Sequence, residues 1–306
     1  MTALAGVEPV QAQPGELLTL AAADGYAIAA TRYAVAHGTA RAHLVIAGAT
    51  GVPQGFYRRF AAYAAARGFA TLTLDYRGIG RSAPASLRGF EVDFRDWARL
   101  DLAAAVAAAG ADAARDGVPL LLVGHSYGGH ALGLLPDPGP IAAAYLFATG
   151  AGWHGWMPPP ERVRVLGMWR VVAPALVRWK GYLPWSLLGM GEDLPLGVYR
   201  QWRRWCGYPH YFFDDPAVGD EMRGLFARVR APIAAANATD DAWAPPRSRD
   251  AFMSGYRNAP WHGVDLDPTA VRDGAHGAAI GHMGYFRPHA TRLWDDALAW
   301  LAAPHG

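Results

Sequence analysis

Short apolar runs alternate with helix-like stretches along most of the chain. The runs have the length and composition of buried strands, and they cover His43–Ala47, Ala70–Asp75, Val118–Val123, Ile141–Thr149, Ala231–Ala236 and Trp261–Leu266. Helical patterns cover Phe56–Arg67, Phe94–Ala114, Ser248–Tyr256 and Pro288–Ala302. Because strands that alternate with helices pair in parallel, this order predicts the α/β class, with a mostly parallel central sheet and helices on both faces.

The start of the chain and the stretch 152–227 depart from this alternation. Leu17–Leu20 and Tyr26–Tyr33 are β-like and flank Asp24-Gly25, a dipeptide that favours a tight hairpin turn. Residues 152–227 contain no strand pattern, several prolines and seven of the twelve tryptophans, namely Trp153, Trp156, Trp169, Trp179, Trp185, Trp202 and Trp205. We interpret this stretch as an inserted helical cap (152–227) between two parts of one core, 1–151 and 228–306.

Composition narrows the class of protein. The chain has 306 residues, of which 52% are hydrophobic, so it is long enough for one large domain with an insertion. A net charge of +2 is too small to indicate a nucleic-acid partner. Cys206 is the only cysteine, so neither an internal disulfide nor a cysteine metal cluster is expected. We interpret Cys206 as a small packed residue.

Targeting and cofactor signals are absent from the sequence pattern. No apolar run is long enough to span a bilayer, and the first residues lack a signal-peptide pattern, so a cytoplasmic location is expected. No dinucleotide fingerprint or metal-ligand cluster is present, and no cofactor or metal is expected. The oligomeric state is left open.

Residues 124–129 read Gly-His-Ser-Tyr-Gly-Gly and follow the apolar run Val118–Val123. This is a G-x-S-x-G pattern between a predicted strand and a predicted helix, the setting of a nucleophile elbow. The glycines allow a sharp turn that bulkier residues would block. The pattern predicts that Ser126 is a nucleophile exposed at the carboxyl edge of the sheet.

A serine nucleophile needs a histidine base and an acid that orients it, and here both are expected after the serine in the chain. Asp240 and Asp241 follow the strand Ala231–Ala236, and we favour Asp241 as the acid while Asp240 stays open as the alternative. We favour His282 as the base over His276. His289 is expected to be structural and on the last helix, and His125 to pack beside the elbow.

An oxyanion hole requires two backbone N–H groups. Tyr127, the residue after the nucleophile, is expected to supply one, and Ala49 in Gly48-Ala-Thr-Gly51 the other, with Thr50 as the alternative. Thr50, Trp153 and Trp156 are expected to contact the substrate, because an aromatic cap indicates an apolar pocket.

Together these segments resemble the α/β-hydrolase superfamily, in its serine-hydrolase branch of esterases and lipases, over residues 15–150 and 228–304. Leu74–Ser82 is similar to the D-x-R-G-x-G-x-S turn of that superfamily, and Asp241 with Pro245 is similar to its D-x-x-x-P acid loop. The loops Gly48–Val52 and Gly281–Phe286 resemble predicted bacterial α/β hydrolases of undefined substrate. The resemblance implies that Asp75 shapes its turn and is not a second catalytic acid.

The favoured function is hydrolysis of a carboxylic ester or thioester through an acyl-Ser126 intermediate. The expected partner is a small acyl substrate that is apolar or aromatic. Acyl transfer to an alcohol or amine by the same residues is an alternative. A peptidase or amidase is another, with Glu161, Glu192 or Asp193 as an anchor for an amine. A non-enzymatic ligand receptor is disfavoured because each expected catalytic position is filled.

Overall fold

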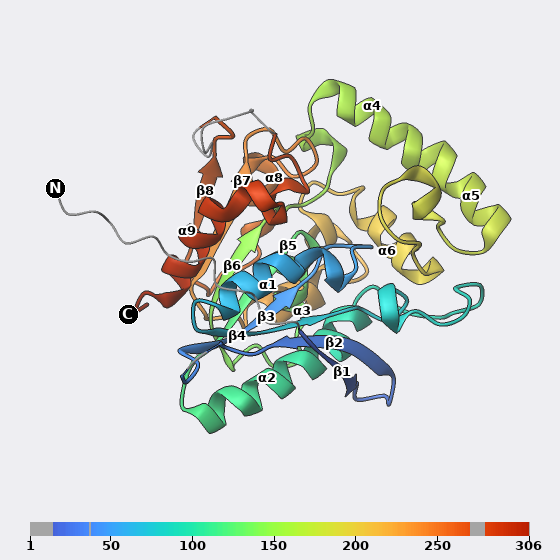
Figure 1. The fold of residues 1–306 in the computed structure, drawn as a ribbon. Coiled ribbons are helices and arrows are strands. Elements are labelled where there is room, and N and C mark those ends of the chain that lie inside the picture. The colour runs from blue at the N-terminus through green and yellow to red at the C-terminus, as the bar shows by residue number, and fades with distance from the viewer. Residues whose placement is uncertain (1–14, 37, 270–278, 306) are drawn as a thin grey trace.

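Eight strands form one sheet in the computed structural model, which describes residues 15–36, 38–269 and 279–305. The strands are β1 Glu16–Ala21, β2 Ala27–Tyr33, β3 Ala42–Ala47, β4 Phe69–Leu74, β5 Leu120–His125, β6 Ile141–Phe147, β7 Ile233–Ala238 and β8 Trp261–Leu266. Their order across the sheet is β1-β2-β4-β3-β5-β6-β7-β8. All neighbours from β4 to β8 are parallel, which confirms the predicted α/β class (Figure 1).

The first two strands form the predicted hairpin. β1 pairs antiparallel with β2 from Glu16↔Arg32 to Ala21↔Ala27, and β2 pairs antiparallel with β4. In the turn, the Asp24 carboxylate accepts the N–H of Tyr26 at 3.2 Å, and Gly25 has a φ of 82°. A positive φ costs glycine little, so the dipeptide closes the hairpin.

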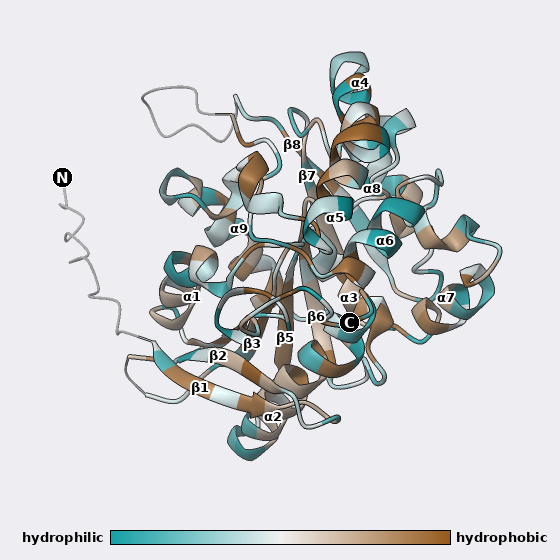
Figure 2. Ribbon diagram, turned by 90° about the vertical axis from the view of Figure 1, so that its right-hand side faces the viewer, coloured by the Kyte–Doolittle hydropathy of each residue, from teal (hydrophilic) through white to brown (hydrophobic). Residues whose placement is uncertain are grey.

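The central strands are buried on both faces. In β3, Val45 belongs to one hydrophobic cluster, whereas Leu44 and Ile46 belong to the other. The alternation follows from the two-residue repeat of a strand, and Figure 2 shows these strands mostly in the colours of hydrophobic residues. Two helices, α1 Arg58–Ala65 and α9 Thr291–Ala302, cover the Leu44 face.

The other face carries α2 Ala103–Asp116, α3 Tyr127–Leu134 and α8 Pro246–Met253. A wider π-helical turn at Trp97–Leu102 precedes α2, so the stretch Phe94–Ala114 is not one regular helix. This turn carries the buried Asp101, whose carboxylate accepts the backbone N–H and the Nε–H of Arg77 at 2.8 and 2.7 Å. The irregular start of α2 therefore holds the turn after β4.

Residues 152–227 form helices and contribute no strand to the sheet. They contain α4 Pro159–Gly167, α5 Ala173–Lys180, α6 Leu196–Trp205 and α7 Gly219–Phe226. Three tryptophans pack together here, with ring centroids 5.1 Å apart for Trp169 and Trp202 and 5.5 Å for Trp185 and Trp202. We call the residues 152–227 the inserted segment.

The last helix of the inserted segment differs from the others. α7 packs against α3, and a Cβ on Gly133 of α3 would lie 2.4 Å from the Phe226 ring. It therefore belongs with the helices that cover the sheet. By contrast, α4 and α5 follow each other end to end through a π-helical turn at Met168–Val172 and extend beyond the sheet (Figure 1). Among the described residues no helix is long and apolar enough to cross a membrane.

A buried histidine gives the fold a pH-dependent stability. His130 of α3 donates from Nε2 to the Gly150 carbonyl at 2.9 Å, and its ring lies 4.2 Å from that of Phe252. Burial lowers the pKa of His130 to about 3. Between that value and the ordinary pKa of about 6.5, only the unfolded chain binds the proton, so stability falls as the pH falls.

The free energy of unfolding of the wild type falls between pH 7 and pH 5. We expect this fall to be about 2 kcal/mol smaller in His130→Gln. The measurement is urea unfolding of both proteins at the two pH values. The exposed His262 supplies a control, because His262→Gln leaves the pH dependence as in the wild type. An equal loss in the wild type and His130→Gln would contradict the assignment.

Candidate active site

Ser126 lies at a sharp turn between β5 and α3. It has a φ of 52° and a ψ of −104°, a conformation that non-glycine residues rarely adopt. The neighbouring glycines make the turn possible, because a Cβ on Gly128 would lie 2.1 Å from the Ala47 carbonyl oxygen. A Cβ on Gly124 would lie 2.9 Å from the backbone of Gly128. The predicted elbow therefore presents Ser126 at the end of β5.

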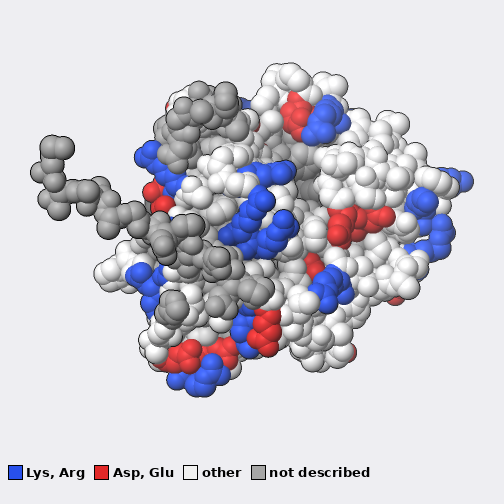
Figure 3. Space-filling view, viewed as in Figure 1, with Lys and Arg blue, Asp and Glu red and all other residues white. Residues whose placement is uncertain are grey.

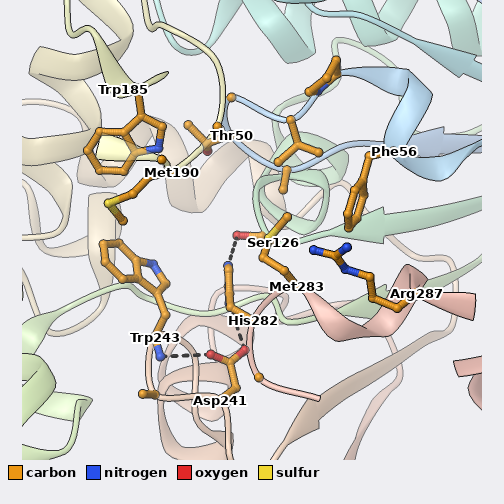
Figure 4. A pocket seen from close by; sticks show the side chains of 18 of the residues that line it. Thr50, Phe56, Ser126, Trp185, Met190, Asp241, Trp243, His282, Met283 and Arg287 are labelled. Carbon is orange, nitrogen blue, oxygen red and sulfur yellow. Dashed lines mark hydrogen bonds and ion pairs between the residues drawn. The ribbon is translucent and has the colours of Figure 1, made fainter. Parts of the chain in front are cut away.

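The structure brings Ser126, His282 and Asp241 into one hydrogen-bonded chain (Figure 4). Ser126 Oγ lies 3.1 Å from His282 Nε2, and His282 Nδ1 lies 2.9 Å from Asp241 Oδ2. With the proton on Nδ1 donated to the carboxylate, Nε2 is left to accept the Ser126 hydroxyl proton. This is the arrangement in which a serine hydroxyl is activated by a neighbouring base.

Asp241 is held as a carboxylate by its surroundings. Its side chain is fully buried, and its Oδ1 accepts the N–H groups of Trp243 and Ala244, each at 2.9 Å. Burial alone would raise the pKa of Asp241, but His282 and these two N–H groups outweigh it and lower the pKa. An ionised acid fixes the tautomer and orientation of His282.

The other candidates for acid and base lie elsewhere. Asp240 is exposed and accepts the N–H of Gly281 at 3.0 Å, so it supports the loop that carries His282. His289 lies in the short turn Pro288–Ala290 before α9 and is exposed. His276 lies outside the described residues.

A second hydrogen-bonded chain, which sequence analysis did not find, runs beneath the site. His125 Nε2 lies 3.0 Å from the His282 carbonyl oxygen, and His125 Nδ1 lies 2.9 Å from the Tyr57 hydroxyl. Because a carbonyl only accepts, His125 Nε2 donates, Nδ1 accepts from Tyr57, and the Tyr57 oxygen accepts the Ala49 N–H at 2.8 Å. Burial and the nearby His282 lower the pKa of His125 to about 3, so the ring stays neutral.

This chain corrects the expected role of Ala49. Its N–H was expected to face the oxyanion, but it is donated to the buried Tyr57 hydroxyl. Thr50, the next residue of the loop, lines the cavity above Ser126. Tyr127 is the first residue of α3, where N–H groups have no partner within the helix. The N–H groups of Thr50 and Tyr127 are therefore the remaining candidates for an oxyanion hole.

A cavity of about 850 Å³ opens at Ser126. Its aromatic and methionine side chains are Phe56, Trp185, Met190, Trp202, Trp243 and Met283, and its charged side chains are Arg58, Glu161, Arg164, Asp240, Asp241 and Arg287. Trp153 and Trp156, which we expected in the pocket, are not among its lining residues. Their rings lie 5.3 Å apart, and Trp156 Nε1 donates to the Pro209 carbonyl at 2.8 Å.

The inserted segment touches the loop after β3. The Glu192 N–H donates to the Gly51 carbonyl at 2.8 Å, and the Glu192 carboxylate accepts the N–H of Gly80. A Cβ on Gly51 would lie 3.1 Å from the Leu194 side chain. The loop that carries Thr50 is thus packed between the sheet and the inserted segment.

Neither a metal cluster nor a reactive cysteine accompanies this site. No group of three or more His, Cys, Asp or Glu side chains among the described residues is placed to hold a metal ion. Cys206 is buried, and burial raises the pKa of its thiol, so it is an inert packed group as expected.

Known proteins with this fold include esterases and a lipase. The family model described as serine aminopeptidase, S33, matches residues 38–190, which is half of the chain. None of the curated proteins matches the sequence.

Three solved structures illustrate the similarity. A soluble variant of monoglyceride lipase from Saccharomyces cerevisiae, solved with a substrate analogue, is 15% identical with a TM-score of 0.68, covering 97% of this chain and 99% of that one. The esterase domain of a Rhodothermus marinus protein is 16% identical with a TM-score of 0.56, covering 95% and 98%. Esterase RhEst1 from Rhodococcus sp. ECU1013 is 18% identical with a TM-score of 0.54, covering 94% and 98%. At such identities the likeness shows the fold alone.

Removing the Tyr57 hydroxyl tests the buried chain. Tyr57→Phe leaves the Ala49 N–H and His125 Nδ1 without their partner, and we expect the free energy of unfolding to fall by about 2–4 kcal/mol. Urea unfolding measures the change. The matched control is Tyr63→Phe, because the Tyr63 hydroxyl bonds Asp295 at the surface, where we expect a loss below about 0.5 kcal/mol. An equal loss of unfolding free energy in Tyr57→Phe and Tyr63→Phe would contradict the proposed hydrogen bonds of the Tyr57 hydroxyl.

Proposed function

The chain belongs to the serine aminopeptidase family S33 of the α/β hydrolases, and on that basis we propose that it cleaves a carboxylic ester or thioester through an acyl-Ser126 intermediate. The observation that carries the proposal is the hydrogen-bonded series from Ser126 through His282 to the buried Asp241. Ser126 and His282 line the cavity. No other cluster in the described residues joins a hydroxyl on a cavity to a histidine and a carboxylate in this way.

In the first half of the reaction, Ser126 Oγ attacks the carbonyl carbon while His282 Nε2 takes its proton. The carbonyl oxygen becomes an oxyanion, which the N–H groups of Tyr127 and Thr50 stabilise in the proposed arrangement. The tetrahedral intermediate then collapses. The bond to the leaving oxygen or sulfur breaks, and His282 Nε2 returns the proton to that atom.

In the second half, a water molecule gives a proton to His282 Nε2 and attacks the acyl carbon. The bond to Ser126 Oγ breaks, the serine recovers its proton, and the free acid leaves. The buried Asp241 stabilises the imidazolium that forms in each half. We propose that the inserted segment acts as a cap, since it supplies Trp185, Met190 and Trp202 to the cavity and so limits the access of bulk water.

The family description suggests an aminopeptidase activity, but the acidic side chains of the inserted segment support it less than they support ester cleavage. A free amine would need an unpaired carboxylate, but Glu161 forms a bidentate ion pair with Arg164, with Nε and Oε2 2.8 Å apart. Glu192 accepts the N–H of Gly80, and Asp193 accepts both the N–H and the hydroxyl of Ser186. All three proposed amine anchors are therefore engaged within the protein.

Acyl transfer uses the same residues and differs only in the second acceptor. Rising concentrations of an alcohol, added to a fixed ester, separate the two activities. Hydrolysis predicts free acid as the main product throughout, and a new ester as the main product at millimolar alcohol would establish a transferase.

Replacing the nucleophile tests the proposed function. We expect Ser126→Ala to lower kcat for a short-chain aryl ester by at least about a thousandfold, because the hydroxyl forms the covalent bond. Circular dichroism and the melting temperature check that the fold is retained. Turnover by a folded Ser126→Ala protein at the wild-type rate would overturn the assignment.

Two neighbouring aspartates give a matched pair of variants. Asp241→Asn removes the charge that orients His282, and we expect a loss in kcat of about 10²–10⁴-fold. Asp240→Asn keeps an oxygen that accepts the Gly281 N–H, and we expect a change of less than about fivefold. Steady-state kinetics on one aryl ester compares them, and a larger loss in Asp240→Asn would transfer the acid role to Asp240.

A further inference from the structure

The cavity has two chemically different sides with Ser126 between them (Figure 4). Trp185, Met190 and Trp243 lie on one side of Ser126, and Phe56, Met283 and Arg287 lie on the other. Arg58 also lines the cavity, from the first position of α1, close in the chain to Phe56. One side is therefore apolar and aromatic, while the other carries the Arg287 guanidinium beside Phe56 and Met283.

The guanidinium groups of Arg58 and Arg287 have no carboxylate partner among residues 15–36, 38–269 and 279–305. In the described part of the chain, neither Arg58 nor Arg287 lies within ion-pair distance of an Asp or Glu. Arg58 Nη1 donates to the Gly55 carbonyl at 3.3 Å. By contrast, Arg164 on the same cavity is paired with Glu161. Asp240 is an exposed acid of the cavity, and its Oδ1 accepts the Gly281 N–H.

Arg287 is restrained in a position that favours an incoming anion. Its guanidinium carbon lies 5.7 Å from the centre of the Phe56 ring, a cation–π distance, and its nitrogens point toward the Ser126 side of the cavity (Figure 4). A planar guanidinium offers two parallel N–H donors to a carboxylate or a phosphate. Arg287 is exposed, so an anion can reach these donors from solvent.

From these observations we propose that Arg58 and Arg287 form an anion-binding subsite, and that the substrate is an amphiphilic ester or thioester. Its apolar group packs on the tryptophan side, its carbonyl lies at Ser126, and a carboxylate or phosphate lies at the two arginines. The proposal rests on the proposed serine hydrolase activity and names its substrate class. Figure 3 shows Lys and Arg side chains gathered near the centre of one face of the molecule, with Asp and Glu side chains beside them.

Matched esters test the subsite. Mono-4-nitrophenyl glutarate and 4-nitrophenyl valerate share the leaving group and the acyl length, and differ in a terminal carboxylate. Valeryl esters of 4-hydroxybenzoate, 4-hydroxyphenyl phosphate and 4-hydroxybenzamide place a carboxylate, a phosphate or a neutral group on the leaving side. The readout is the ratio of kcat/KM for an anionic ester to that for its neutral match.

We expect the wild type to favour at least one anionic ester by about tenfold, and Arg287→Gln and Arg58→Gln each to reduce that ratio by about three- to tenfold. The ester pair with the highest ratio shows whether the subsite prefers a carboxylate or a phosphate. It also shows whether the anion lies on the acyl side or the leaving-group side of the substrate. Arg59→Gln is the control, because Arg59 is the exposed neighbour of Arg58 and does not line the cavity. A ratio near one in the wild type, or the same ratio in Arg287→Gln and Arg59→Gln, overturns the subsite.

A second experiment distinguishes an error in the proposed hydrolase activity from an error in the anion-binding subsite. If no ester is turned over, calorimetry with phenylboronic acid and 3-carboxyphenylboronic acid replaces the kinetic ratio, since a boronic acid bonds reversibly to an activated serine oxygen. Equal affinity of wild type and Ser126→Ala for both acids would overturn the proposed function. Tighter binding to the wild type, without a preference for the carboxylated acid, would overturn the subsite alone.

Discussion

The site depends on the close contact between the first turn of α3 and the end of β3. Gly128 approaches so near to the Ala47 carbonyl that no side chain fits between them, and this contact holds Ser126 in its unfavourable backbone conformation. A strained residue persists only where the surrounding structure determines it. Here β3 and β5 are buried on both faces, so the free energy of packing maintains the turn that places the serine at the cavity.

Around this fixed turn, the remaining groups are placed by hydrogen bonds between loops that are distant in sequence. The neutral His125 joins the His282 loop to Tyr57, and Tyr57 joins it to the loop after β3. Each of these bonds has one possible direction, because the chain ends on a carbonyl that only accepts. The loop that carries His282 and the loop that carries Thr50 are therefore positioned by the same buried connection.

Sequence analysis predicted the parts of this arrangement that depend on local residues and chain order. The hairpin, the elbow and the loops of Asp241 and His282 were found in this way, since glycine, proline and strand patterns determine them locally. The role of Ala49 was assigned wrongly, because its N–H is taken by a hydroxyl from the next helical turn. Trp153 and Trp156 were placed in the pocket on composition alone, whereas the packing of the inserted segment decides which tryptophans reach it.

The backbone hydrogen bond between Glu192 and Gly51 connects the inserted segment to the core of the protein. It ties the segment to the loop that carries Thr50, and the Glu192 carboxylate ties it to the turn after β4 as well. Grafting the corresponding segment from another α/β hydrolase onto this core would therefore disturb the loop beside Ser126 along with the shape of the cavity. In protein engineering, residues 152–227 and the Gly48–Gly51 loop should therefore be replaced together.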